Sequence, residues 1–257
     1  MSGPAYATEP LHRFTEYANS ATQLIRVSMR AIHATRSTPR LIRAIGKVQK
    51  YAIPEWDDTD HNRQLQQADD DAKFAEEQCA TGFPLLQEFM LVGFWGAFEA
   101  FIEDLVIGII SNEPEHLRAE PFAKVRIPLA EFETLGKDDR MRMLLRELQR
   151  TLRADQRRGV NSFEAILGAV KLSGAVPEEF REAIREMHHV RNLIVHRGSC
   201  VDRTFADACP KVSFKVGDRI NVSHEQLSNY VIALFEYGAI VATRISDRYR
   251  AEDEAKV

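Results

Sequence analysis

Apolar side chains recur at intervals of three and four residues along most of the chain, which is the period of one face of an α-helix. The longest such segment, residues 83–110, is apolar almost all round, which is typical of a central helix in a bundle. The sequence therefore predicts an all-α protein. The predicted helices cover residues 10–33, 40–51, 84–111, 137–158, 161–172, 177–197 and 224–248, and one more leads to Cys79.

One stretch departs from the helical period just before the last predicted helix. Residues 212–216 and 219–222 alternate apolar and polar positions on either side of Gly217 and Asp218, which predicts a short β-hairpin. For the whole chain we expect three parts. They are an N-terminal helical extension over residues 1–80, a main helical domain over residues 81–250 and a flexible tail over residues 251–257.

The predicted helix before Gly198 concentrates polar side chains in its last two turns. Gly198 itself suits the left-handed cap that ends many helices. At about 100° per residue, His189, Asn192 and His196 fall on one stripe of the helix, whereas Arg191 lies about 140° from His196. A single straight helix therefore does not place Arg191 and His196 side by side. A long arginine can reach around the helix, or a second copy of the helix can supply the missing partner.

The segment Arg191-Asn192-Leu193-Ile194-Val195-His196 resembles the signature of the HEPN superfamily (higher eukaryotes and prokaryotes nucleotide-binding), an arginine and a histidine separated by a short spacer near a helix end. The flanking sequence adds His-Arg-Gly at the helix end, Val-Asp soon after, and a final long helix. Residues 94–105 also resemble the long acidic and aromatic helix of bacterial HEPN proteins of the RiboL-PSP type. The resemblance covers roughly residues 84–250. It implies an up-and-down helical bundle of the HEPN kind.

The resemblance also implies chemistry for three residues of this segment. His196 would transfer protons, Arg191 would bind the phosphate, and Asn192 would orient either the histidine or the phosphate. The residue types fit these roles, because imidazole titrates with a pKa of about 6.5, and a planar guanidinium stays charged and donates two parallel hydrogen bonds. HEPN ribonucleases pair as dimers that bring two such motifs into one cleft, so a homodimer is implied as well.

Other polar residues are expected to support this site. They are His189 and Arg197 on the same helix and one of Glu99, Glu103 and Asp104 on the central helix. A carboxylate of the central helix would anchor the arginine of the motif. The sequence does not choose among the three acidic residues.

The segment 137–158 carries a second basic feature, a row of arginines at intervals of four, four, three and four. Such a row can follow the phosphate backbone of RNA. The alternative is a solvated helix face whose arginines pair partly with acidic neighbours. The five residues are Arg142, Arg146, Arg150, Arg153 and Arg157.

Composition limits the possible partners and location. The net charge of -4 gives no overall attraction to nucleic acid, so RNA binding must depend on a local basic patch. Three scattered cysteines do not form a disulfide framework, and no signal-peptide pattern opens the chain, so a cytoplasmic location is expected. No membrane span is expected, because four carboxylates interrupt the apolar segment 83–110.

Metal sites have little support in the sequence. Glu186 with His189, and Glu113 with His116, have the Glu-x-x-His spacing of di-iron bundles, but such sites need two further carboxylates. The cysteines Cys200 and Cys209 with the neighbouring histidines match no usual zinc-binding spacing. We therefore expect neither a metal nor a cofactor.

The expected function is that of a metal-independent endoribonuclease, which cleaves RNA by attack of the 2′-hydroxyl on the adjacent phosphate. The resemblance implies a toxin or antiviral defence effector, with RNA as the substrate and an antitoxin or regulatory protein as a further partner. The alternative is a non-catalytic HEPN module that binds RNA, a nucleotide or a partner protein.

Overall fold

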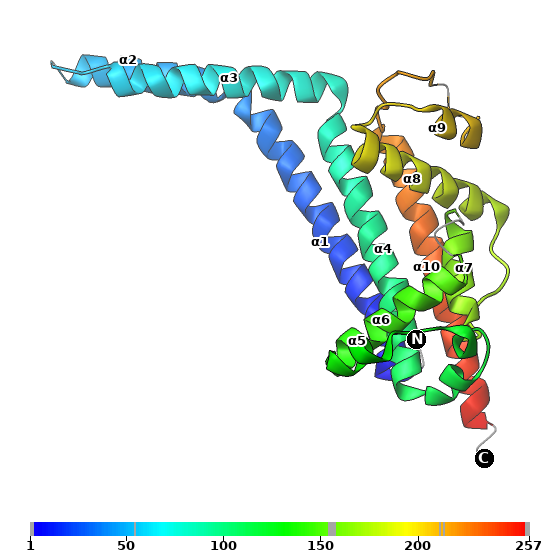
Figure 1. Cartoon of the computed structure of the whole chain (residues 1–257). Coiled ribbons are helices and arrows are strands. Elements are labelled where there is room, and N and C mark those ends of the chain that lie inside the picture. Colours follow the sequence, from blue (N-terminus) through cyan, green and yellow to red (C-terminus); the bar gives the residue numbers. More distant parts are fainter. Residues whose placement is uncertain (1–2, 54, 154–157, 211, 213, 255–257) are drawn as a thin grey trace. The chain divides into compact units, whose positions relative to one another are not determined.

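The structure of the protein is a computed structural model that describes residues 3–53, 55–153, 158–210, 212 and 214–254. These residues form ten α-helices and two short 3-10 helices, labelled η, and no strand (Figure 1). The predicted all-α class is confirmed. In chain order the elements are α1 (Ala5–Thr35), α2 (Thr38–Ala52), α3 (Thr59–Thr81), α4 (Pro84–Asn112), η1 (Pro114–Arg118), η2 (Phe122–Lys124), α5 (Leu129–Thr134), α6 (Lys137–Thr151), α7 (Val160–Gly168), α8 (Glu178–Arg197), α9 (Arg203–Ala208) and α10 (His224–Glu254).

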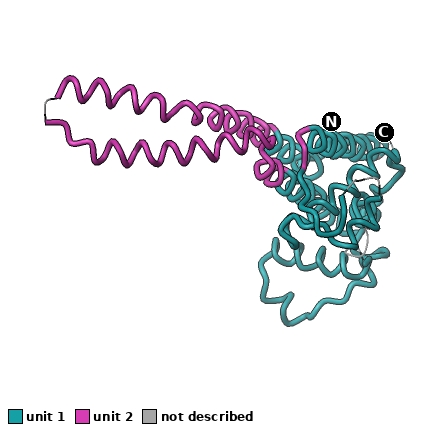
Figure 2. The backbone as a smooth tube through the Cα atoms, turned by 90° about the horizontal axis from the view of Figure 1, so that it is seen from above, with its two compact units in different colours: residues 1–18, 91–221, 225–257 teal, residues 19–90, 222–224 magenta. Residues whose placement is uncertain are grey.

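The chain divides into two compact units, which Figure 2 draws in different colours. Unit 2 comprises residues 19–90 and 222–224, and unit 1 comprises the rest of the chain. The boundaries fall inside α1 and α4, so each of these helices contributes residues to both units. The domain boundary expected after residue 80 stays a prediction.

The core of unit 1 is built around α4, as the sequence predicted. The ring centroid of Phe98 lies 5.3 Å from that of Phe163 in α7, 5.6 Å from that of Tyr237 in α10 and 5.3 Å from that of Phe14 in α1. Such tilted and edge-on aromatic contacts stabilise a core beyond the area they bury. Although α4 is long and apolar, none of the helices in the described ranges is suited to crossing a membrane. The almost completely buried side chains of α4 in unit 1 include Trp95, Phe98, Ile102, Leu105 and Ile109.

The two ends of α8 follow from local sequence. Glu178 and Glu179 occupy its first turn, where the positive end of the helix dipole favours carboxylates. At the other end Gly198 has φ 58° and ψ 39°, the left-handed conformation, and its N–H donates to the carbonyl of Leu193. The predicted cap is confirmed. The helix therefore ends immediately after His196 and Arg197.

The predicted β-hairpin is not confirmed, because the described residues of 212–222 form no strand. The turn at Gly217 exists, with φ 95° at the glycine. Beyond it, however, the backbone pairs with the segment that follows α8: Val201 N–H donates to the Asp218 carbonyl at 2.9 Å, and Ile220 N–H donates to the Ser199 carbonyl at 2.7 Å. Residues 199–201, which follow the cap of α8, thus form the backbone hydrogen bonds that the pattern had assigned to residues 212–216.

Truncating Phe98 tests the central position of α4. We expect Phe98→Ala to lower the free energy of unfolding by about 3–5 kcal/mol, because the cavity would be surrounded by aromatic rings from three other helices. Leu129→Ala is the matched control, since Leu129 is 71% exposed and its truncation should change stability by less than about 0.5 kcal/mol. The free energy of unfolding of each variant is measured in urea. Equal losses for the two variants would contradict the central position of α4.

Candidate functional site

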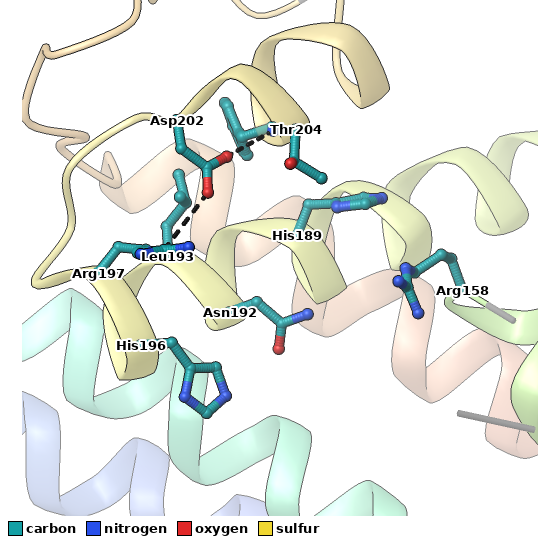
Figure 3. A pocket seen from close by; sticks show the side chains of 9 residues that line it. Arg158, His189, Asn192, Leu193, His196, Arg197, Asp202 and Thr204 are labelled. Atoms are coloured by element: carbon teal, nitrogen blue, oxygen red, sulfur yellow. Dashed lines mark hydrogen bonds and ion pairs between the residues drawn. The ribbon is translucent and has the colours of Figure 1, made fainter. Parts of the chain in front are cut away.

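A pocket of about 300 Å³ lies in unit 1 beside the C-terminal half of α8 (Figure 3). The lining comes from α8, from α9 and the residue before it, and from Arg158, which precedes α7. Most of the lining side chains are polar or charged. They are Arg158, His189, Asn192, Leu193, His196, Arg197, Asp202, Thr204 and Phe205.

Three predicted site residues meet in this pocket because of the helical repeat. His189, Asn192 and His196 all line it, as expected for residues three and seven positions apart on one helix. They differ in exposure: His189 is 9% exposed, Asn192 is half-buried and His196 is exposed. The pocket therefore has one sheltered imidazole and one accessible to a large substrate.

Cationic side chains flank the pocket at both ends. Arg197 Nε lies 3.5 Å from Asp202 Oδ2, and the other oxygen of Asp202 accepts a hydrogen bond of 2.8 Å from the N–H of Phe205 in the first turn of α9. Asp202 thus ties the end of α8 to the start of α9. In Figure 3, Asn192 lies between His196 and Arg158. Arg158 was not among the predicted site residues, because it is distant along the chain from the motif.

Arg191 does not line this pocket. Its Nη1 donates to Asn192 Oδ1 at 3.1 Å, and its Nη2 lies 3.9 Å from Glu99 Oε2 of α4. Asn192 Nδ2 in turn lies 3.0 Å from His188 Nε2. The guanidinium therefore contacts Asn192, which lines the pocket, but lies itself on the side of α8 that faces α4.

Burial and positive charge keep two histidines of α8 neutral. Burial, followed by the charges of His189, Arg158 and Arg191, lowers the pKa of His188 to about 4. Burial, followed by the charges of Arg158 and Arg185, also lowers the pKa of His189. Since neutral imidazole has one acceptor nitrogen, His188 Nε2 can accept the hydrogen bond from Asn192 Nδ2. His188 thus fixes the amide orientation that presents Asn192 Oδ1 to Arg191.

Among the three candidate acidic residues of α4, Glu99 lies near Arg191. Burial raises the pKa of Glu99, and the charge of Arg191 acts in the opposite direction. Glu103 accepts a hydrogen bond of 2.9 Å from Gln149, and Asp104 pairs with Arg13 at 3.0 Å. Geometry thus selects Glu99 as the carboxylate that can hold the motif arginine.

The predicted row of five arginines does not continue along one helix. The helix α6 ends at Thr151, whereas the sequence predicted an end near Arg158. Arg153, with φ 49°, lies beyond that end, and Arg157 lies outside the described residues. Arg142 pairs with Asp104 and Arg150 with Glu147, while Arg146 is exposed. Two of the arginines therefore match the alternative of a face paired with acidic neighbours, and RNA binding by α6 stays a prediction.

A polar stripe that begins with two arginines runs along α8 instead. Arg181 and Arg185 precede His189 at intervals of four, so they continue the stripe formed by His189, Asn192 and His196. A second pocket of about 100 Å³ is lined by these two arginines together with Arg158, which also lines the first pocket. Extending the helical wheel toward the N-terminus of α8 would have found this stripe in the sequence.

One group of possible metal ligands occurs among the described residues, namely Glu113, Glu115 and His116. The Glu113 carboxylate accepts hydrogen bonds from Tyr6 at 2.9 Å and from Tyr249 at 2.5 Å, and it pairs with Arg248. Burial acts to raise the pKa of Glu113, but the two tyrosine hydroxyls and Arg248 outweigh it and lower the pKa. These donors already use the carboxylate oxygens, so the group serves as a structural junction.

No protein-family model, curated protein or solved structure matched the chain. The interpretation of the site therefore depends on its own geometry and chemistry.

Titration of His188 tests the electrostatics of the site. We expect its ring resonances, assigned by their loss in His188→Gln, to titrate near pH 4. Because this folded-state pKa lies below the unfolded value of about 6.5, protonation favours the unfolded state. The contribution of neutral His188 to stability is then complete above pH 6.5 and falls as the pH decreases toward 4. A resonance that titrates above pH 6 would contradict the burial of this ring.

Proposed function

We propose that this protein is a metal-independent endoribonuclease with a helical domain of the HEPN kind. The observation that carries the proposal is the joint placement of His196, Asn192 and the cations Arg158 and Arg197 around one pocket. A phosphodiester needs positive charge, and its cleavage needs proton transfer at both reacting oxygens. The pocket supplies both kinds of group.

In the proposed reaction a base takes the proton of the 2′-hydroxyl, and the 2′-oxygen attacks the adjacent phosphorus. The bond from phosphorus to the 5′-oxygen then breaks, and this oxygen receives a proton. The products are a 2′,3′-cyclic phosphate and a 5′-hydroxyl, so no water or redox partner is consumed. His196 is the proposed proton-transfer residue, and neutral His189 in the same pocket is the second imidazole available for this step.

The role of Arg191 depends on whether one or two copies of the chain form the site. Within one chain it positions Asn192 by the 3.1 Å hydrogen bond and lies beside Glu99. In a cleft shared by two copies, as the HEPN resemblance implies, the same guanidinium would contact the phosphate. Either arrangement makes Arg191 necessary for activity.

A non-catalytic module that binds RNA is the second candidate function. The observation that favours it is the stripe of α8 from Arg181 to His196, which spans 16 residues and rises about 22 Å along the helix. Such a stripe can bind several phosphates without cutting any of them. For either function, the resemblance suggests a toxin or antiviral defence effector that is controlled by a partner protein.

Cleavage of RNA in the presence of EDTA separates the two functions. We expect the parent protein to cut total RNA or tRNA, leaving cyclic phosphate ends. His196→Ala and Arg191→Ala should each lose at least about 100-fold in rate, the usual effect of removing an acid–base group for the histidine and a group that stabilises or positions the reacting phosphate for the arginine. His12→Ala is the control, because His12 is an exposed histidine outside the pocket.

Three results would decide against a metal-independent nuclease that uses His196. Cleavage that stops on chelation would indicate a metal enzyme, and full activity of His196→Ala would remove the proposed proton-transfer residue. Intact RNA in every reaction, together with a stable protein–RNA complex, would favour the binding module.

Measurements of RNA affinity test whether the stripe of α8 binds RNA, which both proposed functions require. We expect Arg185→Ala to weaken binding of a short RNA and to reduce the slope of log affinity against log salt by about one, because one phosphate contact is lost. Arg250→Ala is a suitable control, since Arg250 is exposed and pairs with Asp247 on α10. Equal salt slopes for the parent and Arg185→Ala would place the RNA elsewhere.

A further inference from the structure

Helices α2 and α3 form an antiparallel pair in unit 2 (Figure 2). The buried residues of α2 are Pro39 and Gly46, and those of α3 are Ala68 and Ala75. A Cβ atom at Gly46 would lie 2.3 Å from the ring of His61, so the two helices approach as closely as they do because this residue is glycine. Since only Pro39 and Gly46 of α2 are buried, most of the surface of this helix is left uncovered.

The contact leaves a row of large apolar side chains of α2 uncovered. Leu41 is 63% exposed, Ile45 46% and Val48 67%, and Ala52 is exposed as well. Their intervals of four, three and four place them on one face of the helix. We call these four residues the α2 stripe. Of the sixteen exposed large hydrophobic side chains in the described residues, ten lie in unit 2, so the exposure is concentrated there.

Charged residues are kept away from the α2 stripe. All four charges of α2 are positive, namely Arg40, Arg43, Lys47 and Lys50. On a helical wheel each lies at least about 80° from every member of the stripe. Arg43 pairs with Asp69 of α3 at 2.6 Å, so the basic side of α2 is turned toward the acidic flank of α3. The stripe is therefore an apolar surface bounded on one side by positive charge.

We propose that the α2 stripe is a self-association surface, on which α2 of a second copy of this chain packs in the antiparallel direction. The spacing of four, three and four reads the same in both directions. A two-fold axis between positions 46 and 47 therefore sets Leu41 against the partner's Ala52 and Ile45 against the partner's Val48. Leu41 then meets the smaller Ala52 and Ile45 meets Val48, and each of these contacts is made twice, as in an isologous interface.

Charge favours a second copy over a lipid surface. Four acidic residues, Glu55, Asp57, Asp58 and Asp60, follow α2, and all are exposed. Their negative charge opposes docking of α2 on an anionic membrane, although a basic amphipathic helix alone would suit one. In the antiparallel pair, the same residues lie toward the beginning of the partner helix, where Arg40 is located. The arrangement thus brings opposite charges together at both ends.

The size of the stripe sets the expected strength of association. The 15 residues of α2 extend about 22 Å, and one pair of such helices buries less than the roughly 800 Å² per partner of a standard interface. We therefore expect a concentration-dependent dimer with a dissociation constant on the order of micromolar. This interface does not depend on the proposed ribonuclease activity, because no residue of the pocket contributes to it.

Sedimentation equilibrium of the full chain between about 1 and 100 µM tests the proposal. We expect the parent to associate reversibly, and Ile45→Glu/Val48→Glu to weaken the dimer at least tenfold with unchanged helix content by circular dichroism. Leu129→Glu/Val216→Glu is the matched control, since both residues are exposed hydrophobics of unit 1. This control should associate like the parent.

Cross-linking tests the direction of packing. In a Cys79→Ser/Cys200→Ser background, a mixture of Ile45→Cys and Val48→Cys chains should give more disulfide-linked dimer than either chain alone. Equal yields in the three samples would overturn the antiparallel register.

The self-association surface would be overturned by a parent that is monomeric at 100 µM, or by a Glu variant that dimerises as the parent does. Binding of the monomeric parent to vesicles of anionic lipid, lost in the Glu variant, would assign the stripe to a membrane instead. A Glu variant that stays dimeric leaves the ribonuclease proposal intact, whereas inactivity toward RNA leaves the α2 interface intact.

Discussion

The apolar surface of α4 is the constraint on which unit 1 depends. The buried side chains of α4 in unit 1 cover about half of the helix circumference, from Phe101 through Phe98, Ile102 and Trp95 to Ile110. A helix of this kind must pack against the apolar faces of several others. The helix α8 buries Ile184, Met187 and Val190 in the core, so its opposite face is turned outward. The orientation of the polar stripe is thus a consequence of core packing.

Polar groups beside this core fix the geometry of the candidate site. Arg191, Asn192 and His188 form a chain of contacts at the side of α8 that faces α4, and Glu99 of α4 lies at its end. Burial disfavours the charged forms of Glu99 and His188, while the positive charge of Arg191 favours the carboxylate and disfavours the imidazolium. The result is a neutral histidine and a fixed amide beside an exposed His196. The orientation of Asn192 is set by its neighbours before any substrate binds.

In unit 2, more large apolar side chains are left exposed than in unit 1. Gly46 allows α2 to approach the ring of His61 in α3 closely, but Pro39 and Gly46 are the only buried residues of α2, so its large apolar side chains stay uncovered. Burial of apolar area contributes roughly 25 cal/mol per Å², so an uncovered stripe favours association. The basic side of α2 and the acidic residues after it limit which surfaces can approach.

The periodicity of the sequence determined the all-α class, the central position of α4, the cap at Gly198 and the common stripe of His189, Asn192 and His196, because each depends on neighbours within a few turns. It did not determine the partners that come from distant segments. Arg158 reaches the pocket from before α7, Glu99 rather than Glu103 or Asp104 lies by Arg191, and residues 217–220 pair with 199–201 instead of forming a hairpin. The end of α6 at Thr151 was missed as well. Local hydrogen bonds and side-chain spacing fix a helix and its faces, whereas the choice among equally suitable distant partners depends on how the faces pack around α4, and only the tertiary structure decided it.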